Sequence, residues 1–291
     1  MDFSQDEIIK RANIIVEALP YISRYSGKTI VIKYGGNAMN SPETLRTIMQ
    51  DVATLKIVGV NPILIHGGGP EINAMLKRLD IQSEFINGLR VTTKETMEVV
   101  KMVLGGKVNK SIVSSLNTLG VKAVGLCGSD GNLIEVEKMA PVNGVDYGYV
   151  GVIKNINVKL LSSLTHNYIP VIATIGVDEN GESYNINADT AAGAIGGAMK
   201  AEKLMFLTDI DGIRKDEKDP SSLIPHITVS QIDAMIKDGS ISGGMIPKVN
   251  ACVNGIEKGV ENVIIINGTL PHSILLELFT DSGIGTMVTR G

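Results

Sequence analysis

Two apolar runs of this sequence end directly at glycine-rich turns, and one of them carries a lysine near its end. Lys33 lies in the run Thr29–Tyr34, which leads into Gly35–Gly36, and the run Pro62–His66 leads into Gly67–Gly69. Glycine turns let backbone N–H groups converge on an anion, and a helix that begins there adds positive potential. Either turn alone is typical of an ordinary strand-to-helix connection. Both turns, together with the lysine, predict two anion sites of phosphate size.

The second half of the sequence supplies carboxylates, hydroxyls and a second lysine. The segments Asn185–Asp189 and Thr208–Asp211 and the pair Gly243–Gly244, just before Lys248, carry these groups. Ligands of an open parallel sheet collect at the carboxyl ends of its strands, so we expect these groups to meet Lys33 there. A transferring phosphoryl group needs positive charge on both sides and backbone donors for its oxygens. Two lysines from opposite halves, held by a buried aspartate, would meet that need.

Neither of the common phosphate-binding motifs occurs in the sequence. The absence of Gly-x-x-x-x-Gly-Lys-Ser/Thr argues against a P-loop fold, and the absence of Gly-x-Gly-x-x-Gly after a first strand argues against a dinucleotide site. The side chains of Asp209 and Asp211 have two interpretations. They could bind Mg²⁺ directly, or they could cap a turn. We favour Mg²⁺ bridged mainly by nucleotide phosphates, and we predict no dedicated protein ligand for it.

Alternating apolar and amphipathic stretches are expected to position these groups. Strands are predicted at 29–34, 62–66, 121–126, 169–175, 203–208 and 262–267, and helices at 42–58, 70–79, 93–119, 157–167, 189–200, 229–238 and 245–259. Ser41 as N-cap and Pro42 as first residue are predicted to begin the helix at 42–58. This order predicts an α/β fold, in which a mainly parallel central sheet lies in a three-layer αβα sandwich.

Some segments interrupt this alternation. Residues 127–155 are rich in Gly, Asn and Asp and predict a hairpin over the sheet edge, Asp178–Gly181 predicts a hairpin turn, and 214–222 predicts a solvated loop. Residues 4–24 predict an amphipathic helix before the first strand. We place a division near residue 178, with both parts sharing one sheet.

Composition bounds the class of protein. The 291 residues are 44% hydrophobic, 20% charged and 4% aromatic, which is typical of a globular enzyme. The formal net charge is -4 and the Lys and Arg residues are scattered, so we predict no nucleic acid partner. Cys127 and Cys252 lie in apolar stretches and are expected to be buried free thiols. The first residues are too charged for a signal peptide and no apolar run is long enough to span a membrane, so we expect a cytoplasmic location without a membrane partner.

Six ordered motifs resemble the amino acid kinase family, and within it the branch that acts on N-acetyl-L-glutamate. They are Lys33-Tyr-Gly-Gly, His66-Gly-Gly-Gly-Pro-Glu-Ile, Asn87-Gly-Leu-Arg-Val-Thr, Asn185-Ile-Asn-Ala-Asp, Leu207-Thr-Asp-Ile-Asp-Gly and Gly244-Met-Ile-Pro-Lys-Val. The likeness runs over nearly the whole chain. It implies transfer of the γ-phosphoryl group of ATP to the side-chain carboxylate of N-acetyl-L-glutamate, the second step of L-arginine biosynthesis. Acceptor binding would fall to residues 26–177 and ATP binding to residues 178–291.

The resemblance also implies roles for individual residues. Lys33 and Lys248 would flank the phosphoryl group, and Asp189 would orient both lysines. The residues implied in acceptor binding are Gly68, Gly69, Arg90 and Asn185, and those implied in nucleotide binding are Gly35, Gly36, Thr208, Asp209 and Gly212. Arginine suits an α-carboxylate because its guanidinium can bind both oxygens. His66 is expected to pack or hydrogen-bond beside the glycines, because an ionised acceptor carboxylate needs no general base.

Three of these residues also have ordinary structural interpretations. Lys33 could be a solvated lysine at a strand end, and Arg90 alone could be a surface residue. Asp189 could be the N-cap of the alanine-rich helix that follows, in addition to holding the lysines.

The two ends of the chain resemble the arginine-inhibited, hexameric branch of the family. The resemblance implies that the helix within residues 1–25 interlaces between dimers to give a trimer of dimers, and that L-arginine binds beside it. Candidate arginine contacts lie near the C-terminus and are His272, Glu277, Gly283 and Gly285. The alternative is an N-terminal helix that packs on its own subunit. A nitrogen-signalling regulatory protein is a further candidate partner.

Other functions compete with this interpretation. Within the same fold, the acceptor could be aspartate, glutamate, carbamate or uridylate, although Asn87–Arg90 together with Asn185–Asn187 favours the N-acetylated substrate. From another class, the chain could be a non-catalytic arginine-binding or nitrogen-signalling scaffold, which would have no need of both lysines and Asp189. A dinucleotide-binding oxidoreductase is a distant third.

Overall fold

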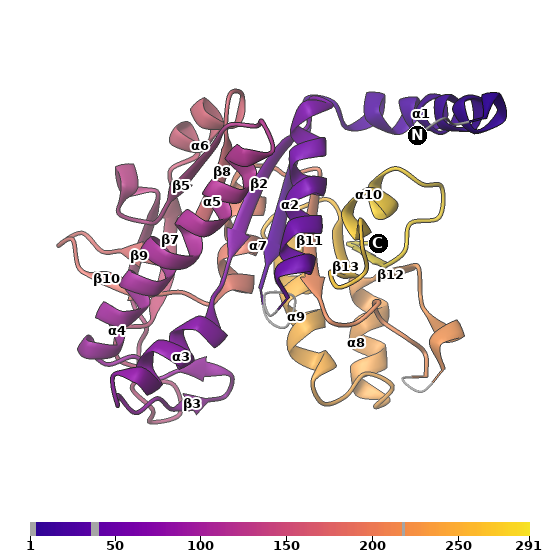
Figure 1. The fold of residues 1–291 in the computed structure, drawn as a ribbon. Coiled ribbons are helices and arrows are strands. Elements are labelled where there is room, and N and C mark those ends of the chain that lie inside the picture. The colour runs from indigo at the N-terminus through magenta and orange to yellow at the C-terminus, as the bar shows by residue number, and fades with distance from the viewer. Residues whose placement is uncertain (1–3, 36–40, 217–218) are drawn as a thin grey trace.

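The computed structural model describes residues 4–35, 41–216 and 219–291, and one eight-stranded sheet lies at its centre (Figure 1). The strand order is β12 (His226–Thr228), β14 (Thr286–Thr289), β13 (Val263–Asn267), β11 (Lys203–Thr208), β1 (Thr29–Tyr34), β2 (Asn61–His66), β8 (Ile169–Ala173) and β5 (Ala123–Leu126). Every neighbouring pair is parallel except β13 and β14. The prediction of an α/β fold with a mainly parallel central sheet is confirmed.

Helices cover both faces of this sheet, because its central strands turn apolar side chains to each face alternately. In β1, Ile30 and Ile32 belong to one buried core and Val31 belongs to the other. The first core is covered by α2 (Pro42–Ile57), α3 (Gly69–Arg78), α4 (Lys94–Val100), α5 (Asn109–Thr118) and α10 (Ser273–Leu278), and the second by α6 (Val158–Thr165), α7 (Ala188–Ala198), α8 (Val229–Lys237) and α9 (Met245–Glu257). The result is a three-layer αβα sandwich.

The two sides of residue 178 meet within the main sheet. Their seam is the parallel pairing of β1 with β11, in which Ile30 lies opposite Lys203 and Lys33 lies opposite Phe206. The division of the chain into an acceptor lobe and a nucleotide lobe stays a prediction.

The segments outside the alternation form two smaller sheets. A four-stranded sheet has the order β10 (Ser183–Asn185), β9 (Ile175–Val177), β6 (Ile134–Lys138) and β7 (Gly151–Ile156). Its pairs β6–β7 and β9–β10 are antiparallel, in agreement with the hairpins predicted in 127–155 and at Asp178–Gly181. A two-stranded hairpin joins β3 (Phe85–Ile86) to β4 (Leu89–Arg90). Its turn residues Asn87 and Gly88 have φ of 50° and 79°, which Asn and Gly adopt readily.

The single helix predicted over 93–119 has three parts. A π-helix, Lys101–Val108, joins α4 to α5 and contains a pair of glycines. Such a segment is wider than an α-helix and occurs often near functional sites. Here it places Leu104 against the turn at Gly68, where a methyl group added to the glycine would lie 2.5 Å from Leu104 Cδ2.

Two local interpretations were wrong. The N-cap of α7 is Asn187, whose Oδ1 accepts hydrogen bonds from the backbone N–H groups of Asp189 and Thr190 at 2.9 and 3.0 Å. Asp189 therefore lies in the first turn and does not cap the helix. Cys252 is buried, but Cys127 is only half-buried, because it lies just after β5 at the edge of the sheet.

The N-terminal helix α1 (Gln5–Tyr25) extends away from the rest of the chain (Figure 1). Its apolar side chains Ile14, Ile15, Val16 and Leu19 are between 52% and 65% exposed. Near its end, the Tyr21 hydroxyl donates a hydrogen bond to Asp281 in the C-terminal segment. Within the described part of the chain, no helix is both long and apolar enough to cross a bilayer.

Candidate active site

The first of the predicted lysines forms an ion pair that joins the two sides of the sheet. Lys33 near the carboxyl end of β1 lies 2.9 Å from Asp189 in the first turn of α7, and its side chain is only 14% exposed. Gly35 leaves room for this arrangement, because a Cβ at that position would lie 3.3 Å from Lys33 Nζ. The pair holds a nearly buried ammonium at the point where we predicted phosphoryl transfer.

The second lysine has a different carboxylate partner. Lys248 Nζ on α9 lies 2.9 Å from Asp209 Oδ1, just beyond β11. We had expected Asp189 to orient both lysines, and the structure brings it to Lys33 alone. Each lysine thus pairs with a different carboxylate. Asp189 lies in the first turn of α7, whereas Asp209 follows β11.

Three pockets lie in a row through this region. The first, which we call the glycine pocket, measures about 240 Å³ and is lined by Gly67–Gly69, Arg90 and Asn185 among others. The second, the lysine pocket, measures about 100 Å³ and is lined by both lysines, both of their carboxylate partners and Thr208. The third, the loop pocket, measures about 660 Å³ and is lined by residues 209–214, Gly243–Gly244 and Asn267.

Shared walls connect the three pockets. Lys33 and Gly35 line both the glycine pocket and the lysine pocket, and Asp209 and Lys248 line both the lysine pocket and the loop pocket. A ligand group in the lysine pocket would therefore contact a lysine from each side. The lysine pocket thus lies between the two larger pockets and shares lining residues with each of them.

The glycine pocket has the properties of an anion site. Helix α3 begins at Gly69 with Gly68 as its N-cap, so its positive end points into the pocket. Gly67 packs with its Cα towards Ala188, where an added Cβ would lie 3.5 Å from the alanine methyl. The glycines thus leave the backbone of this turn uncovered by side chains, and the anion site predicted there stays a prediction.

Arg90 contributes a buried cation to the same pocket. It is only 5% exposed, and burial lowers the pKa of its guanidinium. Its Nη1 donates to Ser83 Oγ, its Nη2 donates to Asn73 Oδ1 at 2.6 Å, and its Cζ lies 4.4 Å from the centre of the Phe85 ring. The interpretation of Arg90 as an ordinary surface residue is therefore wrong. Asn73, Ser83 and Phe85 are partners that sequence reasoning missed.

The predicted residue Asn185 belongs to the stretch 185–188, which forms part of the wall of the glycine pocket. Its Nδ2 donates to Thr92 Oγ1 at 3.3 Å, which orients the amide at the end of β10. Asn187 and Ala188 line the same wall, and neither was singled out from the sequence. Amide groups and a guanidinium in one pocket provide both donors and acceptors for a ligand that carries a carboxylate and an amide.

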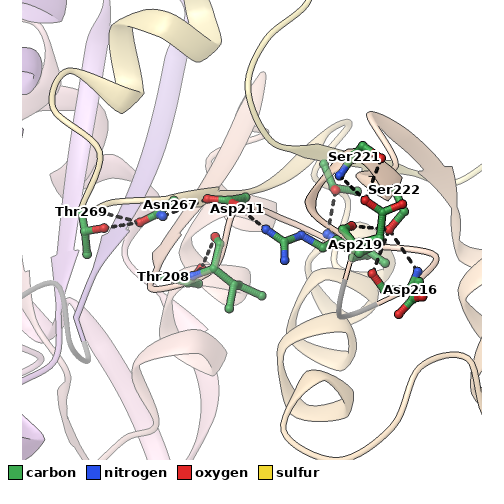
Figure 2. A network of polar contacts seen from close by, with 12 residues as sticks. Thr208, Asp211, Asp216, Asp219, Ser221, Ser222, Asn267 and Thr269 are labelled. Atoms are coloured by element: carbon green, nitrogen blue, oxygen red, sulfur yellow. Dashed lines mark hydrogen bonds and ion pairs between the residues drawn. The ribbon is translucent and has the colours of Figure 1, made fainter.

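A polar network forms the wall of the loop pocket (Figure 2). Asn267 accepts hydrogen bonds from Thr269 N and Oγ1 and donates to Asp211 Oδ1 at 2.9 Å, and Arg214 Nη2 lies 2.6 Å from Asp211 Oδ2. Thr208 lies deeper, in the lysine pocket, where its hydroxyl accepts from Ile210 N at 3.3 Å.

Of the five predicted nucleotide residues, four can be placed and one cannot. Gly212 lines the loop pocket with φ of 154°, and a Cβ there would lie 2.5 Å from Thr286 Oγ1. Asp209 lines the loop and lysine pockets, Thr208 lines the lysine pocket, and Gly35 lies between the lysine and glycine pockets. Gly36 lies outside the described residues. Arg214 and Asn267 were missed, since only the folded loop brings them together.

The donor set near the loop pocket limits how a divalent ion could be held. In the described part of the chain, no three His, Cys, Asp or Glu side chains gather as a metal cage. Asp211 is taken by Asn267 and Arg214, and Asp209 by Lys248. These residues fit an ion whose ligands are mainly phosphate oxygens and water.

His66 lies directly before the glycine turn but is fully buried. Its Nδ1 donates to Gly67 O at 2.8 Å and its Nε2 accepts from Asn109 Nδ2 at 3.1 Å. Both ring nitrogens are therefore hydrogen-bonded while the ring is neutral. Burial lowers its pKa from 6.5 to about 4. A ring that is neutral and occupied in this way supports the glycine turn and is unsuited to act as a base.

The buried His66 makes stability depend on pH. Its pKa is lower in the folded chain, so the unfolded chain binds the extra proton between about pH 4 and 6.5. We expect this residue to leave stability intact above pH 6.5 and to lower the free energy of unfolding as pH falls, by about 3 kcal/mol at pH 4. Urea unfolding of the wild type and of His66→Gln between pH 4.5 and 7.5 measures this. Equal pH slopes for both proteins would contradict the prediction.

The predicted regulatory residues lie apart from the three pockets. Glu277 at the end of α10 accepts hydrogen bonds from the N–H groups of Ile284 and Gly285 at 2.8 and 3.0 Å. Gly283 has φ of 61°, and a Cβ there would lie 2.7 Å from Glu277 Oε2. The Glu277 side chain, at the end of α10, therefore contacts the loop that contains Gly283 and Gly285.

His272 is held by a different contact. Its Nδ1 lies 2.6 Å from Oδ1 of Asp51, a fully buried carboxylate on α2. Burial raises the pKa of the Asp51 carboxyl above its usual value, and the neighbouring His272 only partly opposes this rise. The contact ties the C-terminal segment to the first half of the chain.

A buried lysine near this loop was missed by sequence reasoning. Lys203 at the start of β11 is 6% exposed, and burial lowers its pKa while Glu277 opposes that change. Its Nζ lies 5.8 Å from the centre of the Tyr25 ring, at the end of α1. A lysine at the start of a buried strand is the sequence signal that could have found it.

The fold and the paired lysines define a phosphotransferase-like site, and the chain belongs to the amino acid kinase family, whose sequence model matches residues 28–267. It is 55% identical over 287 residues to acetylglutamate kinase of Caldicellulosiruptor saccharolyticus, covering 97% of this chain and 98% of that one. It is 54% identical over 291 residues to acetylglutamate kinase of Heliobacterium modesticaldum, with 97% and 99% covered. Among solved structures, N-acetylglutamate synthase from Neisseria gonorrhoeae, complexed with coenzyme A and N-acetyl-glutamate, matches with a TM-score of 0.85 at 25% identity, covering 96% of this chain and 63% of that chain.

Proposed function

We propose that this chain is an acetylglutamate kinase, which transfers the γ-phosphoryl group of ATP to the side-chain carboxylate of N-acetyl-L-glutamate. The product is N-acetyl-L-glutamyl 5-phosphate, in the second step of L-arginine biosynthesis. The observation that carries the proposal is the row of three pockets, with a lysine from each side at the middle one. Identity above 50% to acetylglutamate kinases over nearly the full length supports the choice of acceptor.

The assigned residues act mainly through position and charge. N-acetyl-L-glutamate occupies the glycine pocket, with its α-carboxylate on Arg90 and its acetamide beside Asn185, and ATP occupies the loop pocket. The reacting carboxylate and the γ-phosphate meet in the lysine pocket, where Lys33 and Lys248 balance the charge of two anions that would otherwise repel each other. The acceptor oxygen is already ionised, so no base has to remove a proton.

The backbone and a divalent ion complete the electrostatic environment. The N–H groups of Gly68 and Gly69 at the start of α3 face the transferring group and stabilise its oxygens. We infer Mg²⁺ as the ion bound with ATP, and it would supply positive charge that balances the charge of the phosphates. Asp189 holds Lys33, and Asp209 holds Lys248 until the nucleotide engages it.

A panel of acceptors tests the proposed reaction. ADP release from Mg-ATP is measured with N-acetyl-L-glutamate, glutamate, aspartate, carbamate and UMP in parallel. Selective turnover of N-acetyl-L-glutamate is the expected result, because an amide and a guanidinium line the walls where the acetamide and the α-carboxylate would lie. Preference for another acceptor would reassign the enzyme within its family, and turnover of none would favour a non-catalytic scaffold.

We further propose feedback inhibition by L-arginine and assembly into a hexamer of three dimers. The proposed arginine site lies between the end of α1 and the C-terminal loop, where Tyr25, Lys203 and the loop held by Glu277 come together. The exposed apolar side chains of α1 are the proposed contact between dimers. A cytoplasmic location and docking of a nitrogen-signalling protein stay predictions.

A charge placed on α1 should disturb both assembly and inhibition. Ile15 is 65% exposed, so we expect Ile15→Asp to leave the fold intact while it separates hexamers into dimers. The arginine concentration for half-inhibition should then rise about tenfold or more, because the coupled site is lost. Light scattering and ADP release measure the two effects. Asn13→Asp, an equal charge change on the same helix, is the control, and an unchanged hexamer in Ile15→Asp would contradict the proposed interface.

A further inference from the structure

Arg90 has a particular set of neighbours. Within the described residues, its guanidinium forms no ion pair with a carboxylate, although it is nearly buried. Its neighbours are instead two neutral oxygens, Asn73 Oδ1 and Ser83 Oγ, and the face of the Phe85 ring. Neutral partners fix the direction of a guanidinium without neutralising its charge, so the full charge stays available to an anion in the pocket.

Helix α3 connects this cation to the glycine turn. The helix begins at Gly69, which lines the glycine pocket, and Asn73 follows four residues later. Four residues of an α-helix span about 6 Å along its axis. Because Asn73 accepts a hydrogen bond from Arg90, the cation is tied to the same rigid element whose first backbone N–H groups line the pocket.

We propose that Asn73 and Ser83 are positioning residues that hold Arg90 at a set distance from the glycine turn, so that the pocket selects acceptors by the separation of their two carboxylates. This inference rests on the proposed function and goes beyond it, because it assigns acceptor length to contacts that do not touch the acceptor. Asn73 sets the position along α3, and Ser83 holds the guanidinium from the loop before β3.

A merely structural role for these two residues is disfavoured by their exposure. Both Asn73 and Ser83 are exposed on the surface, and only the guanidinium between them is buried. Removing either side chain therefore leaves the core of the protein unchanged. The expected consequence is a guanidinium that is free to rotate away from its set position.

The test compares two acceptors in four variants. N-Acetyl-L-glutamate carries both carboxylates, and 4-acetamidobutyrate keeps the acetamide and the reacting carboxylate but lacks the α-carboxylate. We expect Asn73→Ala to raise KM for N-acetyl-L-glutamate about tenfold, with kcat and KM for ATP nearly unchanged. KM for 4-acetamidobutyrate, or its inhibition constant if it is not turned over, should not change. Asn73→Asp should raise KM further, because a carboxylate there competes for the guanidinium.

The remaining variants separate positioning from other effects. Arg90→Ala removes the group through which Asn73 acts, so adding Asn73→Ala to it should change nothing further. Lys77→Ala, one turn along the same helix, is the control. If 4-acetamidobutyrate neither reacts nor inhibits, the double variant decides alone.

Each contrary outcome has a distinct meaning. An unchanged KM in Asn73→Ala, an equal rise for both acceptors, or a rise that persists without Arg90 would overturn the positioning role while leaving the kinase intact. Wild-type protein that does not phosphorylate N-acetyl-L-glutamate would instead overturn the proposed function, and this inference with it.

Discussion

Replacing Lys33 with alanine is expected to lower kcat for phosphoryl transfer about a thousandfold. The ammonium lies between the glycine pocket and the lysine pocket, only 14% exposed, where its charge is weakly screened. Lys33 would contact the acceptor carboxylate and the γ-phosphate as these two negative groups approach each other. Its loss should therefore slow the chemical step more than it weakens substrate binding. Steady-state ADP release at saturating ATP and N-acetyl-L-glutamate measures the effect.

A second lysine close to the same strand, β1, is available as a control. Lys28, just before β1, is 53% exposed and lies 3.4 Å from Glu202 on the surface. Lys28→Ala should therefore change kcat less than twofold. A similar small change in Lys33→Ala would remove this lysine from the mechanism. Asp189→Asn should reproduce part of the loss, since it removes the carboxylate that pairs with Lys33.

Replacing Lys248 with alanine should have the second largest effect, a fall in kcat of about a hundredfold together with a higher KM for ATP. This lysine lines both the lysine pocket and the loop pocket, so it lies where the nucleotide and the transferring group would meet. Its loss also leaves Asp209 facing the phosphates without its cationic partner, which adds repulsion. Initial rates across a range of ATP concentrations separate the two components.

The ion pair between Lys248 and Asp209 allows this prediction to be compared with the effect of changing its other member. Asp209→Asn should raise KM for ATP less than Lys248→Ala, because the variant loses a negative charge beside the phosphates and keeps the lysine. Lys237→Ala on the exposed part of α8 is the control for general effects of losing a lysine. Equal KM for ATP in the wild type and Lys248→Ala would place the nucleotide elsewhere.

Six strands of the main sheet were predicted, because its central strands are apolar on both faces, whereas the short strands β12 and β14 at one edge were missed. The predicted bounds of β1 and β11 agree with the structure, since each run is bounded by polar or glycine residues. The start of α2 was equally clear, because Ser41 Oγ accepts from Thr44 N as a capping residue should and Pro42 follows it. Local chemistry decides these features, and the sequence displays local chemistry directly.

Other features depend on contacts between distant segments. The pairing of Lys248 with Asp209 joins residues 39 positions apart, and the contact between Lys203 and Tyr25 depends on where α1 ends. Likewise, Arg90 meets Asn73 only because the hairpin of β3 and β4 folds back on α3. Spacing along the chain carries no signal for such pairs, so Lys248 and Arg90 were found but their contacts with Asp209 and Asn73 were not.

The seam between β1 and β11 has a mechanical consequence. The two sides of the molecule are joined there by a continuous backbone ladder, so closure around substrates has to proceed by twisting the sheet, not by swinging on a flexible linker. Points near the axis of a rotation move least. Lys33 lies on the seam strand itself, whereas Lys248 is carried on a helix outside the sheet. We therefore expect Lys33 to act as a stationary reference and Lys248 to be the charge that arrives, so that full compensation of the anions would exist only in the closed form.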